Sequence, residues 1–120
     1  VQADALRLPV RPGALDGATA HSVLYLVPDP AGLLAEVHRA LRPGGRVALL
    51  EPRAGEAPLA PAWRRGARFG TSMALWRAMS RLHRRFEAGE LAGLLRAAGF
   101  REVRVEPALD GFALLASATR

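Results

Sequence analysis

Small and apolar residues fill the first clear strand pattern of the chain. Residues 16–24 are mostly small and apolar without clean alternation, which is typical of a strand covered on both faces. Residues 1–5 are partly β-branched and quickly interrupted, so they predict the tail of a strand, and the prolines that follow predict a loop. The start of the chain therefore predicts two strands joined by an irregular segment.

A helix and a second buried strand come next. Asp29 followed by Pro30 predicts a helix start, because an aspartate caps free amides and the fixed φ of proline suits the first helical position. Apolar residues continue at helical spacing until residues 42–45, where an arginine can meet the terminal carbonyls and glycines supply positive φ. Residues 46–51 predict a buried strand, which Pro52 ends.

The second half of the chain predicts helices and then a final pair of strands. The 61–86 segment has helical spacing, with Gly66 or Gly70 able to split it. Its apolar stripe consists of Leu75, Met79, Leu82 and Phe86, and in one of the interpretations given below it packs inward beneath a cationic face. A further helix over 87–98 stops at Gly99. The last two strands, residues 101–106 and 112–118, are expected to form an antiparallel pair at a sheet edge.

This order of elements, together with the composition, indicates one α/β domain over residues 1–120. Helix, tight glycine turn and hydrophobic strand follow one another, and that unit favours a parallel sheet. The chain has 120 residues and no cysteine, which excludes disulfide scaffolds, zinc ribbons and CxxC redox chemistry. The apolar stretches are far shorter than the roughly 20 residues of a membrane-spanning helix. We expect a cytoplasmic protein.

Charge is concentrated in one segment. All 17 basic residues are arginine, the net charge is +6, and seven arginines lie between residues 57 and 86, a window without Asp or Glu. Three interpretations stay open for this helical insert: a solvated cationic face, a lid over an apolar substrate pocket, or a surface that binds RNA or anionic lipid. The sequence does not choose among them.

Five short strings follow one another with the predicted elements between them. They are Ala3-Asp4-Ala5 with Leu8-Pro9, Leu15-Asp16, LYLVPDP at residues 24–30, LRPGGR at residues 41–46 and AAGF at residues 97–100. Together they resemble the C-terminal part of a class I S-adenosylmethionine-dependent methyltransferase of the kind that acts on small molecules. The resemblance implies a Rossmann-like sheet, mostly parallel, with a C-terminal antiparallel strand pair.

The resemblance also implies a part that the chain lacks. Methyltransferases of this class begin with a strand and a glycine-rich turn for the methionine end of the cofactor, and a second strand carries an acidic residue for the ribose. Residues 1–120 contain neither, so we expect about 60 further residues upstream. They would belong to the same polypeptide or to another chain that adds to the exposed edge of the family's fourth strand. The isolated chain is expected to be inactive.

By resemblance, the contacts with S-adenosylmethionine fall at two strand ends. Asp4 and Ala5 would end the family's third strand and face the adenine. Ala20 and His21 would end the fourth strand, near the methionine portion. His21 is also the candidate catalytic residue, as a general base for a substrate hydroxyl, with a structural histidine at a strand end as the alternative.

Four residues are expected on the substrate side. Tyr25 would lie near the transferred methyl group, with core packing as the alternative, and Glu51 would end the fifth strand and point into the same crevice. Trp63 and Trp76 would line an apolar pocket under the insert of residues 57–86. No histidine has a second ligand at metal spacing, so we expect no metal site.

The leading hypothesis is therefore methyl transfer from S-adenosylmethionine to a small, apolar molecule in the complete protein. The implied mechanism is direct displacement at the methyl group, with donor and acceptor held in line and a proton removed where needed. The alternative is a non-catalytic module whose arginine-rich helix binds RNA, an anionic membrane or an acidic partner. Binding of S-adenosylmethionine separates the two.

Overall fold

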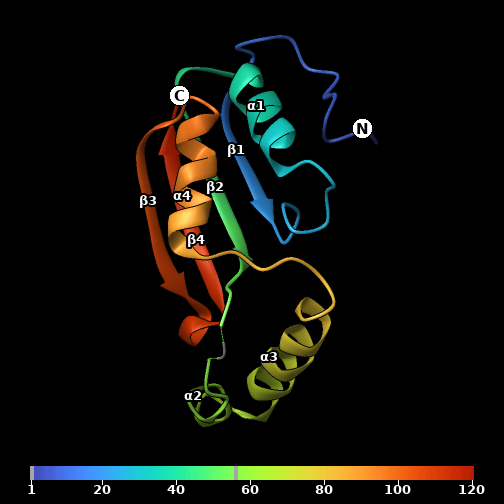
Figure 1. Cartoon of the computed structure of the whole chain (residues 1–120), viewed down its shortest axis with the longest axis vertical. Coiled ribbons are helices and arrows are strands. Elements are labelled where there is room, and N and C mark those ends of the chain that lie inside the picture. Colours follow the sequence, from blue (N-terminus) through green and yellow to red (C-terminus); the bar gives the residue numbers. More distant parts are fainter. Residues whose placement is uncertain (1, 56) are drawn as a thin grey trace.

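The computed structural model describes residues 2–55 and 57–120, and its main elements follow the predicted order from residue 15 onward (Figure 1). Gly66, with φ of +121°, separates two helices within the predicted helical insert. The elements are β1 Leu15–His21, α1 Pro30–Ala40, β2 Leu41–Pro52, α2 Ala60–Arg64, α3 Ala67–Ser80, α4 Ala88–Ala97, β3 Arg101–Ala108, the 3-10 turn η1 Leu109–Gly111, and β4 Ala113–Thr119.

The strand tail predicted at the start of the chain is wrong for residues 2–5, which form no strand; Val1 lies outside the described residues. A strand needs a neighbour to pair its backbone groups, and this segment has none in the described chain. The loop that follows, at residues 8–10, is tied to α1 by hydrogen bonds. The Leu8 amide donates a hydrogen bond to Glu36 at 2.8 Å, and the Arg39 guanidinium donates to the carbonyl of Val10 at 2.9 Å.

The four strands form one mixed sheet in the order β1-β2-β4-β3. β1 and β2 run parallel, whereas β4 is antiparallel to both β2 and β3. The predicted Rossmann-like α/β class with its C-terminal antiparallel pair is therefore confirmed. β4 lies inside the sheet, which leaves β3 and β1 as its two edges.

The crossover from β1 to β2 forms as the capping residues predict. Asp29 is the N-cap of α1 and its carboxylate accepts a hydrogen bond from the Gly32 amide at 2.8 Å, while Pro30 occupies the first turn. The first residues of β2 are tied to the residue that follows β4, because the Gly44 amide donates a hydrogen bond of 2.9 Å to the Arg120 carbonyl. Gly44 has a φ of +79°, a conformation that favours glycine.

The main core lies between one face of the sheet and the helix pair α1 and α4, which stand on the same side (Figure 1). Alternate residues of the central strands point into it, as the strand period of two requires. Removing these side chains from water stabilises the domain by roughly 1.5–3 kcal/mol each. The largest fully buried aliphatic side chains are Leu24, Leu34, Leu41, Leu49, Leu91, Leu95 and Leu114.

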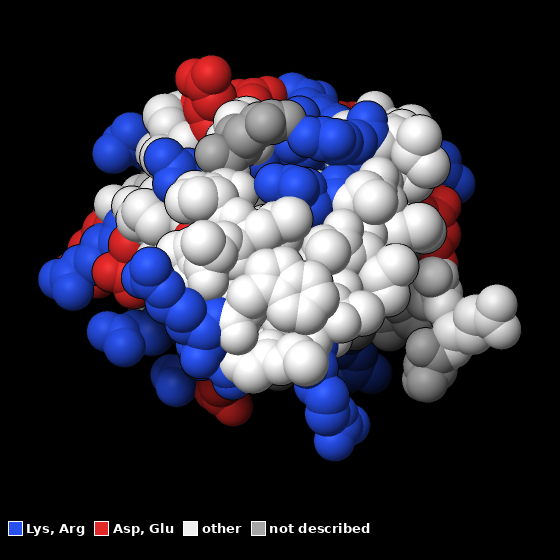
Figure 2. Space-filling view, turned by 90° about the horizontal axis from the view of Figure 1, so that it is seen from below, with Lys and Arg blue, Asp and Glu red and all other residues white. Residues whose placement is uncertain are grey.

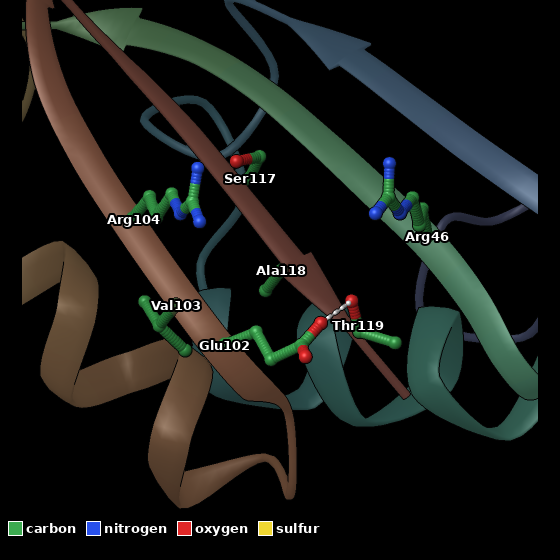
Figure 3. A pocket seen from close by; sticks show the side chains of 7 residues that line it. All are labelled: Arg46, Glu102, Val103, Arg104, Ser117, Ala118 and Thr119. Carbon is green, nitrogen blue, oxygen red and sulfur yellow. Dashed lines mark hydrogen bonds between the residues drawn. The ribbon is translucent and has the colours of Figure 1, made fainter.

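The opposite sheet face is only partly buried within the described chain. Ser117 and Arg104 are exposed there, and Leu115 keeps 38% of its surface exposed. A depression of about 480 Å³ lies on this face. Figure 3 shows the side chains that line it, among which the Thr119 hydroxyl donates a hydrogen bond of 2.9 Å to Glu102. Helices α1 and α4 therefore pack on one of the two sheet faces and leave the other face without a helix from the described chain.

Helices α2 and α3 form an arm that extends beyond the sheet, at the bottom of Figure 1. We call residues 60–82 the helical arm. The arm has a small core of its own, in which Ala62 and Met73 pack with Phe112 from the start of β4. An ion pair of 3.4 Å between Arg65 and Asp110 also joins the arm to the β3–β4 turn.

The inward-packing stripe predicted for residues 61–86 is wrong for three of its four members. Leu75, Met79 and Leu82 are 62%, 60% and 78% exposed, and only Phe86 is fully buried. Helical spacing identifies residues that share a face, but it does not say which face meets the core. α3 instead turns Gly70, Met73 and Ser80 inward.

Gly70 offers a test of this packing. A Cβ at Gly70 would lie 2.5 Å from two ring carbons of Trp63, whereas a Cβ at Gly93 in α4 meets nothing within 4 Å. Both glycines are helical, so alanine brings the same gain in helix propensity at each site. We expect Gly93→Ala to raise the free energy of unfolding by about 0.5–1 kcal/mol and Gly70→Ala to lower it.

Urea unfolding curves of the two variants measure this difference. Trp63 must move in Gly70→Ala, so its fluorescence should change in that variant alone. Equal stabilisation by both substitutions would contradict the contact between Gly70 and Trp63.

Candidate functional site

The candidate site lies where the parallel strands β1 and β2 end. Both strands run in one direction, so their carboxyl ends meet at the same edge of the sheet, which is where open α/β sheets bind ligands. His21 is the last residue of β1, is exposed, and pairs in register with Leu50. Ala20 precedes it and is half-buried opposite Leu49. Both residues lie at the strand end predicted for cofactor contact.

Ser22 follows directly and has two unusual properties. Its φ is +55°, a left-handed conformation that costs a non-glycine residue energy. Its hydroxyl is buried and has no hydrogen-bond partner in the described part of the chain. A strained backbone and an unsatisfied polar group together indicate a position kept for a ligand. The sequence did not single out Ser22, because a serine after a strand carries no signal of its backbone angle.

The carboxylate of Glu51 holds the loop that follows β1 by hydrogen bonds. It is fully buried and accepts hydrogen bonds from the amides of Val23 at 3.0 Å, Leu24 at 2.8 Å and Tyr25 at 3.4 Å. Burial raises the pKa of Glu51, and the three amides oppose that rise because they stabilise the charged form. The side chain that we expected to orient substrate is thus occupied by the loop, and it acts on the site by positioning Tyr25.

Tyr25 lies at the contact between two segments that are distant in sequence. Its ring meets the ring of His83 edge to face, with 5.4 Å between the centroids. His83 follows α3 and its Nδ1 lies 3.2 Å from the carbonyl oxygen of Met79. The sequence alone predicts no role for His83, which sits among arginines. Only the fold brings it to the loop after β1.

The remaining predicted residues belong to other segments of the chain. Asp4 is exposed and its carboxylate accepts a hydrogen bond from the Leu6 amide at 2.9 Å, while Ala5 packs on the main core. Trp63 and Trp76 both belong to the helical arm, where Trp63 lies on Gly70 and Trp76 packs in the small core. Their roles in cofactor and substrate contact stay predictions.

Residues 2–55 and 57–120 contain no group of three or more His, Asp or Glu side chains that could hold a metal ion. None of the described helices combines the length and hydropathy that crossing a bilayer demands.

Comparisons with known proteins agree with this architecture. Residues 1–49 match the family described as the methyltransferase domain. A protein of 37.1 kDa in transposon Tn4556 of Streptomyces fradiae is 51% identical over 45 residues, and a chloroplastic methyltransferase of Arabidopsis thaliana is 44% identical over 45 residues. Both matches span 38% of this chain and 13% of the relative, so the chain corresponds to a small part of each.

Solved structures extend the likeness to the whole fold. A S-adenosylmethionine-dependent methyltransferase from Thermotoga maritima, described as a possible histamine N-methyltransferase, superposes with a TM-score of 0.72 at 22% identity. The match covers 99% of this chain and 62% of that one. The fold is therefore that of class I S-adenosylmethionine-dependent methyltransferases, as the sequence motifs predicted, and residues 1–49 are similar to the methyltransferase domain family.

The buried position of Glu51 predicts a pH dependence. The folded state holds the Glu51 proton more tightly than the unfolded state, so its raised pKa contributes stability at low pH that is lost as pH rises through it. Glu51→Gln has no such titration. The free energy of unfolding of the wild type, minus that of Glu51→Gln, should therefore fall as pH rises from the ordinary value of 4.5.

Urea unfolding at a series of pH values measures that difference. Glu51→Ala provides the comparison that removes all acceptors, and it should lose about 1–3 kcal/mol at every pH for each amide left unpaired. A wild type that gains stability over Glu51→Gln as pH rises would contradict the account of Glu51.

Proposed function

We propose that this chain forms the acceptor-facing part of an enzyme that transfers a methyl group from S-adenosylmethionine to a small, apolar molecule. The observation that carries the proposal is the end of β1, where the strained Ser22, next to His21, carries a buried hydroxyl without a hydrogen-bond partner in the described chain. The match of residues 1–49 to a methyltransferase domain supports it. The chain spans 62% of its Thermotoga counterpart, so the activity belongs to the complete protein.

The residues at this strand end suit the methionine portion of the cofactor. Ser22 can donate a hydrogen bond to a carboxylate or carbonyl oxygen, and the exposed His21 lies next to it. Ala20 contributes backbone at the same edge, and by resemblance Asp4 and Ala5 would take the adenine end. S-adenosylmethionine supplies an electrophilic methyl group on a sulfonium. The chain's own residues then need to hold the acceptor in line and exclude water.

Acceptor binding is assigned to the loop after β1. Glu51 holds this loop by its backbone amides, so Tyr25 keeps one orientation against His83. A neutral imidazole at His21 can remove a proton from an acceptor hydroxyl or amine. Trp63 and Trp76 belong to the arm and would close over a bound apolar molecule. Methyl transfer then requires that the acceptor molecule is oriented and that one group accepts its proton. Residues at this edge of the sheet would do both.

Two variants separate cofactor binding from proton removal. Ser22→Ala should weaken S-adenosylmethionine binding by about tenfold, the value of one hydrogen bond of about 1.4 kcal/mol. His21→Asn should leave binding within a few-fold and lower kcat by about 10²-fold or more, because it removes the proton acceptor. Ser72→Ala, at an exposed position of α3, is the matched control and should change neither quantity.

Calorimetric titration of the intact gene product gives the affinity, and transfer of a labelled methyl group to candidate acceptors gives kcat. Absence of S-adenosylmethionine binding in the wild type would reject the proposal and favour the non-catalytic module. Equal affinity of Ser22→Ala and wild type would remove Ser22 from the cofactor site.

A further inference from the structure

Helix α3 exposes a row of large apolar side chains that cover nothing within the described chain. Leu75 and Met79 are 62% and 60% exposed, and Leu82 just beyond the helix is 78% exposed. The three follow one another at intervals of four and three residues, which places them along one side of a helix. Trp63, on the neighbouring helix α2, is 46% exposed. Side chains of this size are rarely gathered on a surface without a partner.

The other side of the same helix is also apolar. Met73 is buried in the small core with Phe112, and Phe69 and Trp76 pack against it. A helix that is apolar on two sides is normally covered on both. The core explains the inner side of α3 and leaves the outer row to be covered by something else.

The charged residues around this apolar row indicate the chemistry of the partner that covers it. Residues 57–86 contain seven arginines and no Asp or Glu. Figure 2, a view from the end of the molecule that carries the arm, shows an uncharged central area bordered by basic side chains. Arg64 and Arg68 are exposed, and Arg68 lies on the same side of α3 as Leu75 by helical spacing. The arm therefore exposes large apolar side chains together with guanidinium groups.

We propose that the outer side of the helical arm docks on an anionic lipid surface. Guanidinium groups bind lipid phosphates through paired hydrogen bonds, and aliphatic side chains beside them enter the boundary between headgroups and acyl chains. RNA fits less well, because it would use the arginines and stack on aromatic rings but would leave Leu75, Met79 and Leu82 in water. An anionic membrane surface can bind both the arginines and the exposed aliphatic side chains.

The docking surface ends beside the candidate site. His83 follows Leu82 directly, and its ring contacts Tyr25 on the loop after β1. Lipid contact at Leu82 would thus bring that loop close to the membrane surface. The inference rests on the arm alone, so it stands or fails independently of methyl transfer.

Vesicle flotation of the intact gene product tests the proposal directly. We expect binding to vesicles of phosphatidylcholine mixed with phosphatidylglycerol, and at least tenfold weaker binding to phosphatidylcholine alone. Raising the salt concentration should weaken the binding, since screening reduces the arginine contribution. A wild type that does not bind the anionic vesicles at low salt would overturn the proposal.

Substitutions on the outer row identify the surface. The triple variant Leu75→Gln, Met79→Gln and Leu82→Gln changes exposed positions only, so it should remain folded by circular dichroism and lose at least tenfold in vesicle binding. Arg64→Gln with Arg68→Gln should weaken binding and reduce its salt dependence. The matched control is Leu26→Gln, at a residue 55% exposed outside the arm, and it should bind like the wild type.

Two further outcomes would reject lipid docking. The first is vesicle binding that survives the triple variant. The second is tight binding to single-stranded RNA, lost in the arginine variant, without any vesicle binding. As an independent readout, Trp63 emission in a Trp76→Phe background should shift to the blue with anionic vesicles. An unchanged spectrum in a vesicle-bound protein would exclude the arm as the contact surface.

Discussion

The geometry of the candidate site depends on the buried carboxylate of Glu51. It stands at the end of β2, without exposed surface, and receives the amides of three consecutive residues from the loop after β1. Burying a carboxylate costs free energy, which raises its pKa, and hydrogen bonds from the loop offset that cost. One side chain thus fixes the loop between β1 and α1, and with it the direction of Tyr25.

This constraint on the loop also affects the backbone of Ser22. Ser22 lies between the end of β1, which is paired to β2, and the loop that Glu51 holds. The chain must change direction there within one residue, and it does so with a positive φ at a residue that has a Cβ. Strain at the carboxyl end of a parallel strand is common in functional sites, because the surrounding structure can maintain a geometry that a ligand needs.

The sequence predicted the elements whose signals are local. Asp29 and Pro30 start α1 because capping depends on neighbours along the chain, and Gly99 ends α4 with a φ of +96° for the same reason. The sequence also placed Ala20 and His21 at the correct end of β1. It could not predict the partners of Glu51 or the contact of His83 with Tyr25, since both join segments that are distant in sequence. The predicted inward orientation of the apolar stripe in α3 was wrong for another reason. That helix is apolar on two sides, and helical spacing does not show which side faces the core.

The central claim is that the carboxyl end of β1, next to the loop that Glu51 holds, binds S-adenosylmethionine. It is tested most directly by following the backbone amide resonances of the intact gene product by NMR during titration with this cofactor. The account predicts saturable shifts at Ser22, Val23 and His21, with one common dissociation constant. Saturable binding that leaves these resonances unchanged and shifts others would contradict it.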